Sequence, residues 1–115
     1  MNANHLKGNF FEFCAMLVLI AKCYRPLQQN IQTPYGETDL VAQKNKTIHV
    51  IEVKYRKSRD KSHVAIHPNQ RDRLINQAKY HLKKEKWAEH VSLDVMLFYP
   101  KWPFFDHIKN VWDIE

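Results

Sequence analysis

Four charged side chains interrupt two otherwise apolar segments. Glu37 and Asp39 lie two residues apart in GETDLVA, and Glu52 and Lys54 lie two residues apart in IEVKYR. Charges in segments typical of buried strands cost folding free energy unless other charges or ions compensate for them. Neighbouring carboxylates bind divalent cations, and a lysine beside them can act on a water molecule or on charge that develops on phosphate. These residue types predict metal-dependent hydrolysis of phosphodiester bonds.

The spacing of the two segments predicts how they pair. If Asn45–Lys46 is a two-residue turn, Lys44 pairs with Thr47, and Asp39 then lies opposite Glu52. Opposed residues have Cβ atoms about 4.5–5.5 Å apart, close enough for two carboxylates to share one ion. Oxygen ligands on rigid strands suit Mg²⁺ or Mn²⁺.

The same register places Glu37 opposite Lys54, which leaves a second interpretation open. The two residues could form a cross-strand ion pair while Asp39 and Glu52 lie at a solvent-facing edge. The pattern alone favours neither interpretation.

The charge balance indicates the kind of partner. Lys and Arg outnumber Asp and Glu by 18 to 12, a net charge of +6, which favours a polyanion, with nucleic acid ahead of a membrane surface. A basic stretch follows the proposed site and is a candidate phosphate track, with a solvated loop as the alternative. The stretch consists of Arg56, Lys57, Arg59 and Lys61.

The apolar pattern predicts a single domain, residues 1–115, built as a small α/β fold. Apolar periodicity and turn residues predict helices and strands in the order helix, three strands, helix, strand. Residues 100–115 are expected to form a tail or a short extra strand. The expected helices are 4–23 and 68–86, and the expected strands are 25–32, 37–44, 47–56 and 91–99.

The first predicted helix is apolar on nearly every side from Phe10 to Ala21, so we expect it to be largely buried. Glu12 lies on an apolar face of this helix, where a carboxylate needs a partner. Cys14 and Cys23 are too far apart along a helix to form a disulfide, which favours the reducing cytoplasm. No segment is long and apolar enough to predict a membrane span.

The two charged segments, together with Gly8, Glu12 and Ala15 in the preceding helix, resemble the YraN family of small uncharacterised bacterial proteins. That family is similar to the archaeal Holliday junction resolvases and to the PD-(D/E)XK nuclease superfamily. The resemblance extends from about Gly8 to Phe98. It implies a restriction-endonuclease-like α/β core, a mixed β-sheet flanked by helices, in the order α-β-β-β-α-β.

The resemblance also implies roles for individual residues. Asp39 and Glu52 match the metal-binding acids, Lys54 matches the catalytic lysine, and Glu12 matches an acid that some resolvase-like members carry on the first helix. Glu37 resembles a glutamate beside the site and is an accessory candidate.

The resemblance also bears on one strand residue and on one helix motif. Thr38 stands where relatives usually carry Ile. Gln77 to Tyr80 is similar to a helix motif of some related nucleases at altered spacing, and we expect ordinary helix surface there.

The favoured hypothesis is a Mg²⁺-dependent endonuclease that acts on DNA rather than RNA, with branched or structured DNA among its substrates. One alternative is a nuclease-like module that binds nucleic acid without turnover. Another is a scaffold that binds a partner through the C-terminal stretch KWPFFDHIKNVW. We also retain a homodimer among the partners. For five aromatic residues we favour core packing or a dimer contact over base stacking: Trp87, Trp102, Phe104, Phe105 and Trp112.

Overall fold

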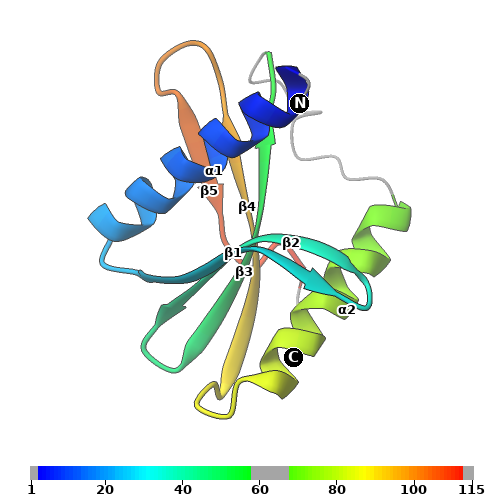
Figure 1. The fold of residues 1–115 in the computed structure, drawn as a ribbon. Helices are drawn as coiled ribbons and strands as arrows, with labels where there is room; N and C mark the ends of the chain where they lie inside the picture. The colour runs from blue at the N-terminus through cyan, green and yellow to red at the C-terminus, as the bar shows by residue number, and fades with distance from the viewer. Residues whose placement is uncertain (1–2, 58–67, 113–115) are drawn as a thin grey trace.

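A five-stranded mixed sheet with one helix on each face makes up the described part of the chain (Figure 1). The structure is a computed structural model that describes residues 3–57 and 68–112. The elements in chain order are α1 (Ala3–Ala21), β1 (Arg25–Thr33), β2 (Gly36–Lys44), β3 (Thr47–Tyr55), α2 (Pro68–Lys84), β4 (His90–Phe98) and β5 (Phe105–Ile108).

The strands lie in the sheet in their chain order, β1 to β5. Only β3 and β4 are parallel, joined through α2, and the other neighbours are antiparallel. The predicted α/β class and element order are confirmed, and the arrangement is compatible with a restriction-endonuclease-like core. β5 lies within residues 100–115, for which the sequence predicts a tail or a short extra strand.

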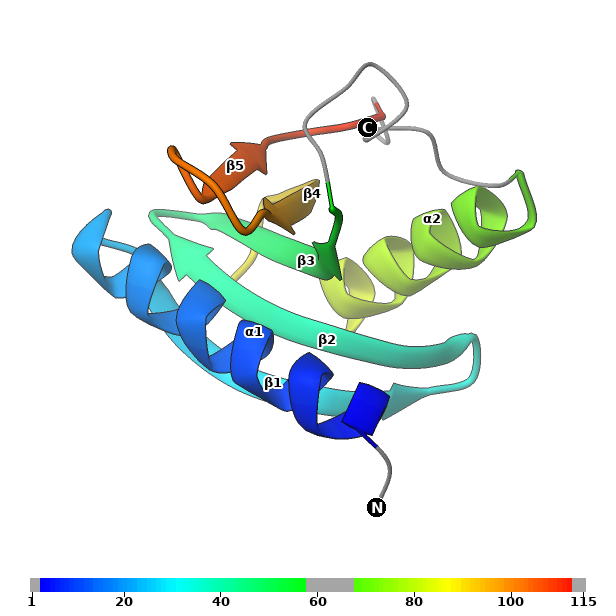
Figure 2. The same ribbon diagram turned by 90° about the horizontal axis from the view of Figure 1, so that it is seen from above.

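The two helices bury opposite faces of the sheet, as the view from above shows (Figure 2). On the α1 side, Ala15 and Leu19 pack with apolar side chains of β2, β3 and β4 that include Leu40, Ile51 and Met96. On the α2 side, Leu74 and Ala78 pack in a second cluster, which includes Val41, Val50 and Leu93. Neighbouring residues of β2 and β3 therefore serve different cores, which explains why these strands are apolar on both faces.

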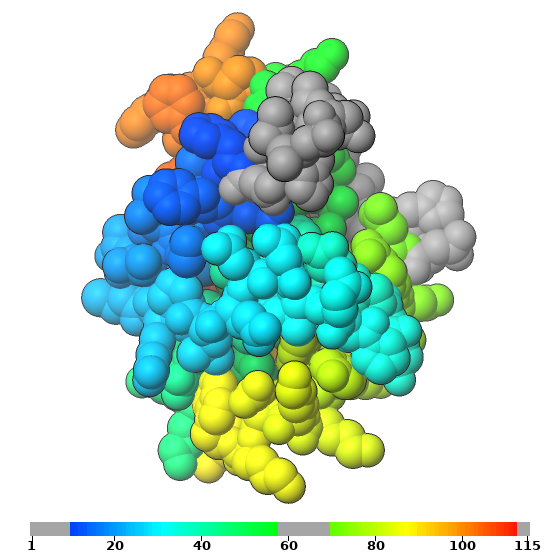
Figure 3. All heavy atoms as spheres, in the orientation of Figure 1, coloured from blue at the N-terminus to red at the C-terminus, as the bar shows by residue number. Residues whose placement is uncertain are grey.

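The prediction that α1 is largely buried is wrong. Phe10, Phe13, Leu17 and Ile20 each expose half or more of their surface, whereas Ala15 and Leu19 expose none. A single helix on a sheet contacts it along one stripe, and no other described element covers its outer side. In the space-filling view α1 and β1 form much of the visible face (Figure 3).

Both helices end two residues earlier than predicted, at Ala21 and Lys84. Cys23 takes a left-handed conformation with φ of 70°, and Tyr24 N donates to Leu19 O at 2.9 Å, which closes the C-terminus of α1. Both cysteines are free, as the sequence predicted. Among helices in the described ranges, none combines the length and the hydrophobicity that a membrane span requires.

The β2–β3 hairpin has the predicted register from Lys44 with Thr47 to Leu40 with Ile51. Asn45 in the turn has φ of 57°, a conformation that asparagine tolerates well. The register follows from this two-residue turn and from the need to bury both apolar faces.

The turn between β1 and β2 packs closely on α2. Gly36 has φ of 113°, and a Cβ atom built there would lie 3.2 Å from Gln77 Nε2 and 3.3 Å from Arg73 Cδ. The same Gln77 Nε2 donates hydrogen bonds to Tyr35 O at 3.2 Å and to Glu37 O at 3.3 Å. The backbone on both sides of Gly36 is therefore fixed to α2.

We expect Gly36→Ala to lower the free energy of unfolding by about 1–3 kcal/mol, because alanine is strained at this φ and its methyl group crowds Gln77. Urea denaturation measures the change. Tyr35→Ala is the matched control, since Tyr35 is exposed and contributes only its carbonyl to this contact. An unchanged midpoint for Gly36→Ala would contradict the close packing of the turn on α2.

Candidate functional site

Strands β2 and β3 separate at the point where the acidic side chains begin. Their ladder ends with Leu40 opposite Ile51. Beyond it, Val53 N donates to Asp39 Oδ2 at 2.9 Å, so a side-chain carboxylate accepts the hydrogen bond from this backbone amide. On the other side of Asp39, Asn30 in β1 has φ of 55°, which interrupts the regular strand conformation there. Asp39 thus lies where β2 departs from regular pairing.

The ladder stops before it reaches the two pairs predicted from the register. Asp39 does not pair with Glu52 in a continuous ladder, because the Asp39 carboxylate accepts the hydrogen bond that the Val53 amide would otherwise donate to the backbone of β2. Glu37 does not pair with Lys54; it pairs with Gln32 of β1 and is exposed. The alternative interpretation, a cross-strand ion pair between Glu37 and Lys54, is therefore wrong.

Glu52 and Lys54 lie together on β3. By strand alternation they share the face of Ile48 and Val50, which is the face that α2 covers. Glu52 is 9% exposed, and its Oε1 lies 3.5 Å from Lys54 Nζ. Burial, and then the charge of Asp39, raise the pKa of Glu52 to about 7, although Lys54 opposes the shift. Burial likewise raises the pKa of Asp39, against the hydrogen bond from Val53.

Glu12 of α1 joins the same cluster. Its side chain is 8% exposed, and burial followed by the charges of Asp39, Glu37 and Glu52 raises its pKa to about 7. The partner that the sequence required for Glu12 is Asn30. With its amide nitrogen toward the acids, as its neighbours require, Asn30 donates to Glu12 Oε1 at 2.6 Å and to Glu37 Oε1 at 2.9 Å.

Three residues of α2 support the cluster although the sequence did not identify them. The positive charge of Arg73 opposes the rise that burial causes in the pKa of Asp39 and Glu52. Gln77 is completely buried, so the expectation of ordinary helix surface at this position is wrong. Thr38 Oγ1 donates to Gln77 Oε1 at 3.3 Å and lies 2.9 Å from His81 Nε2.

A signal for this network was present in the sequence. Arg73, Gln77 and His81 recur every four residues and so lie along one side of α2. Thr38 carries the one side-chain hydroxyl of β2, and this hydroxyl bonds to that side of the helix. Neither feature is informative without the other, because only the packed structure brings residues 39 positions apart together.

The donor atoms of the cluster suit a hard divalent cation. Asp39, Glu52 and Glu12 offer carboxylate oxygens, the ligand type that Mg²⁺ and Mn²⁺ prefer. Their pKa values are raised first by burial and then by the charges of neighbouring acids, and a cation would offset both effects. Within residues 3–57 and 68–112, no three His, Cys, Asp or Glu side chains form a ready-made metal site. The donor chemistry therefore fits, while convergence on one ion requires side-chain movement.

The structure also describes several of the basic and aromatic residues that the sequence singled out. Arg56 is half-buried, with Nη1 donating to Tyr55 O at 3.0 Å, and Lys57 is exposed. Arg59 and Lys61 lie outside the described residues. Phe105 packs against the core on the α1 side, and Trp87 and Trp112 pack against the core on the α2 side. Trp102 is 82% exposed and Phe104 is 50% exposed, so core packing is wrong for these two, and a dimer contact stays a prediction.

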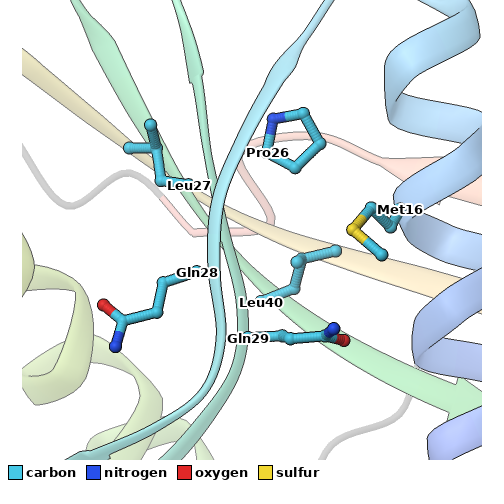
Figure 4. A pocket seen from close by; sticks show the side chains of 6 residues that line it. All are labelled: Met16, Pro26, Leu27, Gln28, Gln29 and Leu40. Atoms are coloured by element: carbon cyan, nitrogen blue, oxygen red, sulfur yellow. The ribbon is translucent and has the colours of Figure 1, made fainter.

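A pocket between α1 and β1 is lined by residues other than the acids. Figure 4 shows its lining, with Met16 of α1 and Leu40 of β2 beside residues of β1. The β1 residues are Pro26, Leu27, Gln28 and Gln29. None of these side chains is titratable, so the pocket offers no groups for acid–base chemistry.

The fold and the cluster define a small α/β protein with buried acids and a lysine at the separation of two central strands. A family model described as "Uncharacterised protein family UPF0102" matches residues 11–98, and the chain belongs to this family.

Several members are similar over most of their length. A UPF0102 protein of Methylorubrum extorquens is 34% identical over 98% of this chain and 89% of its own. The UPF0102 protein FN1370 of Fusobacterium nucleatum is 32% identical over 100% of this chain and 98% of its own. Another, of Rhodopseudomonas palustris, is 39% identical over 76% of this chain and 68% of its own.

The raised pKa of Glu52 predicts how stability depends on pH. An acid whose folded pKa, about 7, exceeds its usual value of 4.5 binds protons more strongly when folded, so stability falls as pH rises from about 4.5 to 7. Glu52→Gln removes this loss. We expect it to raise the free energy of unfolding at pH 8 by about 1–3 kcal/mol in EDTA and to leave it nearly unchanged at pH 4.5.

Urea denaturation of the wild type and the variant at both pH values measures this difference. Glu89→Gln is the matched control, because Glu89 is exposed and only its surface pair with Lys46, at 3.3 Å, is lost. A variant whose stability parallels that of the wild type across this pH range would show that Glu52 is not held at raised pKa.

Proposed function

We propose that the protein is a metal-dependent endonuclease that hydrolyses phosphodiester bonds in DNA, with branched or structured DNA among its substrates. The observation that carries the proposal is the group of Asp39, Glu52 and Lys54 where β2 and β3 separate, in which Glu52 is buried and the other two are partly buried. Two buried acids that repel each other destabilise a fold, and such groups are typical of sites that bind a cation or move protons.

Asp39, Glu52 and Glu12 would hold Mg²⁺ or Mn²⁺. The ion would supply stabilisation of charge on the phosphate and a bound water of lowered pKa. Asp39 is suited to a fixed position, because its second oxygen is already held by Val53 N at 2.9 Å.

The remaining groups have roles that follow from their contacts. Lys54, held 3.5 Å from Glu52, can donate a proton or a hydrogen bond to a water molecule or to a phosphate oxygen. Glu12, with a pKa of about 7, can accept and release a proton near neutral pH while Asn30 orients it. Arg73 adds positive charge on the α2 side of the cluster.

The proposed substrate contacts extend from the site along basic residues. The net charge of +6 favours a polyanionic substrate, and Arg56 and Lys57, followed by Arg59 and Lys61, are the proposed phosphate contacts. We propose DNA rather than RNA as the substrate and the cytoplasm as the compartment.

The proposal predicts the effect of removing each charge. Asp39→Asn and Glu52→Gln should abolish cleavage while they keep the fold, since each removes a charge at nearly constant volume. Lys54→Met should lower the single-turnover rate by about 10²–10⁴-fold yet keep metal binding. Single-turnover cleavage of duplex and four-way-junction DNA, with Mg²⁺, Mn²⁺ or EDTA, measures these effects.

Two exposed residues serve as controls. Asp72→Asn beside Arg73 removes an exposed acid, Lys79→Met removes an exposed lysine, and both should leave the rate unchanged. DNA affinity in EDTA should hold or increase in Asp39→Asn, because repulsion of the phosphates falls. A wild-type protein that binds DNA but cleaves it with neither metal would instead be a binding module.

Nucleic-acid binding should depend steeply on salt. If about six or more basic groups contact phosphates, affinity should fall by roughly 10³–10⁵-fold between about 50 and 200 mM salt, because released counterions drive the binding. Fluorescence anisotropy with labelled duplex DNA across this range tests the expectation. A flat response, or no binding at low salt, would exclude both the nuclease and the binding module.

A further inference from the structure

A second group of buried polar side chains lies away from the acids, around Asp94 of β4. Asp94 is completely buried, and its Oδ2 accepts hydrogen bonds from His49 Nδ1 and His107 Nε2, each at 2.8 Å. Its Oδ1 accepts from Ser92 Oγ and from Asn110 N. Burial alone would raise the pKa of Asp94, but the hydrogen bonds from His107 and His49 hold it well below its usual range. The carboxylate therefore stays charged and has both oxygens occupied.

Asp94 fixes the orientation of His107 and, through it, the position of Lys22. Because His107 donates from Nε2 to Asp94, its Nδ1 can accept a hydrogen bond when the ring is neutral. Lys22 Nζ lies 2.7 Å from this atom. The ammonium group of Lys22 is thus held by a buried network rather than left free at the end of α1.

Two more lysines converge on the same place from other elements. The Nζ atoms of Lys22, Lys44 and Lys109 lie 5.9, 4.6 and 5.8 Å from the ring centroid of Tyr24. They come from the end of α1, the end of β2 and the residue after β5. Lys44 Nζ also donates to Lys22 O at 3.4 Å.

The positive charges of these lysines are balanced only in part, by the charge of Asp94, which opposes the fall in the pKa of Lys22. Burial, and then the charges of Lys109 and Lys44, lower the pKa of Lys22. No carboxylate of the described residues forms an ion pair with any of the three lysines. Both oxygens of Asp94 already accept hydrogen bonds from the groups named above. Ammonium groups gathered in this way repel one another unless an anion lies between them.

We propose that Lys22, Lys44 and Lys109 form a binding site for a phosphate group. Lysine is a strong point-charge ligand of phosphate oxygens, and the three ammonium groups keep up to seven donor hydrogens beyond the two that bond to His107 Nδ1 and Lys22 O. Tyr24 is 5% exposed and contacts the rings of His49 and His107, so its face is not available to stack on a base. The site therefore recognises phosphate rather than nucleobase.

This site is distinct from the proposed nuclease centre and goes beyond its function. Lys22 follows the last residue of α1 and lies ten positions after Glu12, which corresponds to about 15 Å along the helix axis. The phosphate could belong to a small molecule such as pyrophosphate or to the backbone of a nucleic acid. The experiment below separates these sources.

The test is an NMR titration of the ¹⁵N-labelled full chain with sodium pyrophosphate, and separately with a 20-base-pair duplex, in EDTA. We expect saturable shifts of the Tyr24 and Lys44 amides and of the His49 and His107 ring protons. In Lys44→Gln/Lys109→Gln, affinity at this site should fall about tenfold or more for each lysine, as expected for a lost charge-assisted hydrogen bond.

Lys79→Gln/Lys86→Gln is the matched control, because both residues are exposed and the change in net charge is the same. Thermal unfolding in phosphate-free buffer verifies the fold of Lys44→Gln/Lys109→Gln, which should be at least as stable as the wild type because repulsion is relieved. Asp39→Asn should bind pyrophosphate as the wild type does, so a failure of the nuclease proposal leaves this result unaffected.

The results either identify the source of the phosphate group or contradict the proposed site. Loss of pyrophosphate binding with unchanged duplex binding indicates a small phosphate ligand. A salt slope for duplex binding that falls by about 2 in Lys44→Gln/Lys109→Gln indicates backbone phosphates. The proposal is wrong if neither ligand shifts these resonances, or if the Lys79→Gln/Lys86→Gln control weakens binding equally.

Discussion

The hydrogen bond from Val53 N to Asp39 Oδ2 determines how the centre of this molecule is organised. In a continuous ladder the amide of Val53 would be available to a backbone carbonyl of β2, and the two strands would stay in register. Here a carboxylate accepts the hydrogen bond, and regular pairing ends at Leu40 and Ile51. The separation leaves space in which Glu52 and Lys54 on β3 and Glu12 from α1 come near Asp39 without displacing a ladder hydrogen bond.

Burial gives this arrangement its electrostatic character. The pKa values of Glu12 and Glu52 are about 7, so near neutral pH each is close to the point at which it exchanges a proton. A fold selected for stability alone would place apolar side chains at these positions. Asn30, Arg73 and Lys54 reduce the cost of the buried charge, and the remaining repulsion is what makes the cluster suitable for a cation. The opposite imbalance exists at Tyr24, where three lysines gather beside a carboxylate whose oxygens are already occupied.

The hydrogen-bonding partners of buried groups show where local sequence patterns stop being informative. Glu12 was expected to need a partner, but Asn30 lies 18 positions away in a strand whose exposed residues carry no periodic signal. The altered spacing of the motif from Gln77 to Tyr80 predicts ordinary helix surface at Gln77. Its burial depends on the β1–β2 turn, which approaches α2 at Gly36 and presents two backbone carbonyls to the Gln77 amide.

The sequence by itself determined the α/β class, the order of the elements, the register of the β2–β3 hairpin and the identity of the acids and the lysine. Those features follow from periodicity, turn residues and the cost of charge within apolar strands, all of which act over a few residues. Only the tertiary structure decided that β2 and β3 separate at Asp39, that the outer side of α1 stays exposed, and that Lys22 meets His107, 85 positions away. Contacts of that kind depend on how helices and strands pack, because the partner of a polar group is whichever side chain the fold brings within hydrogen-bonding distance.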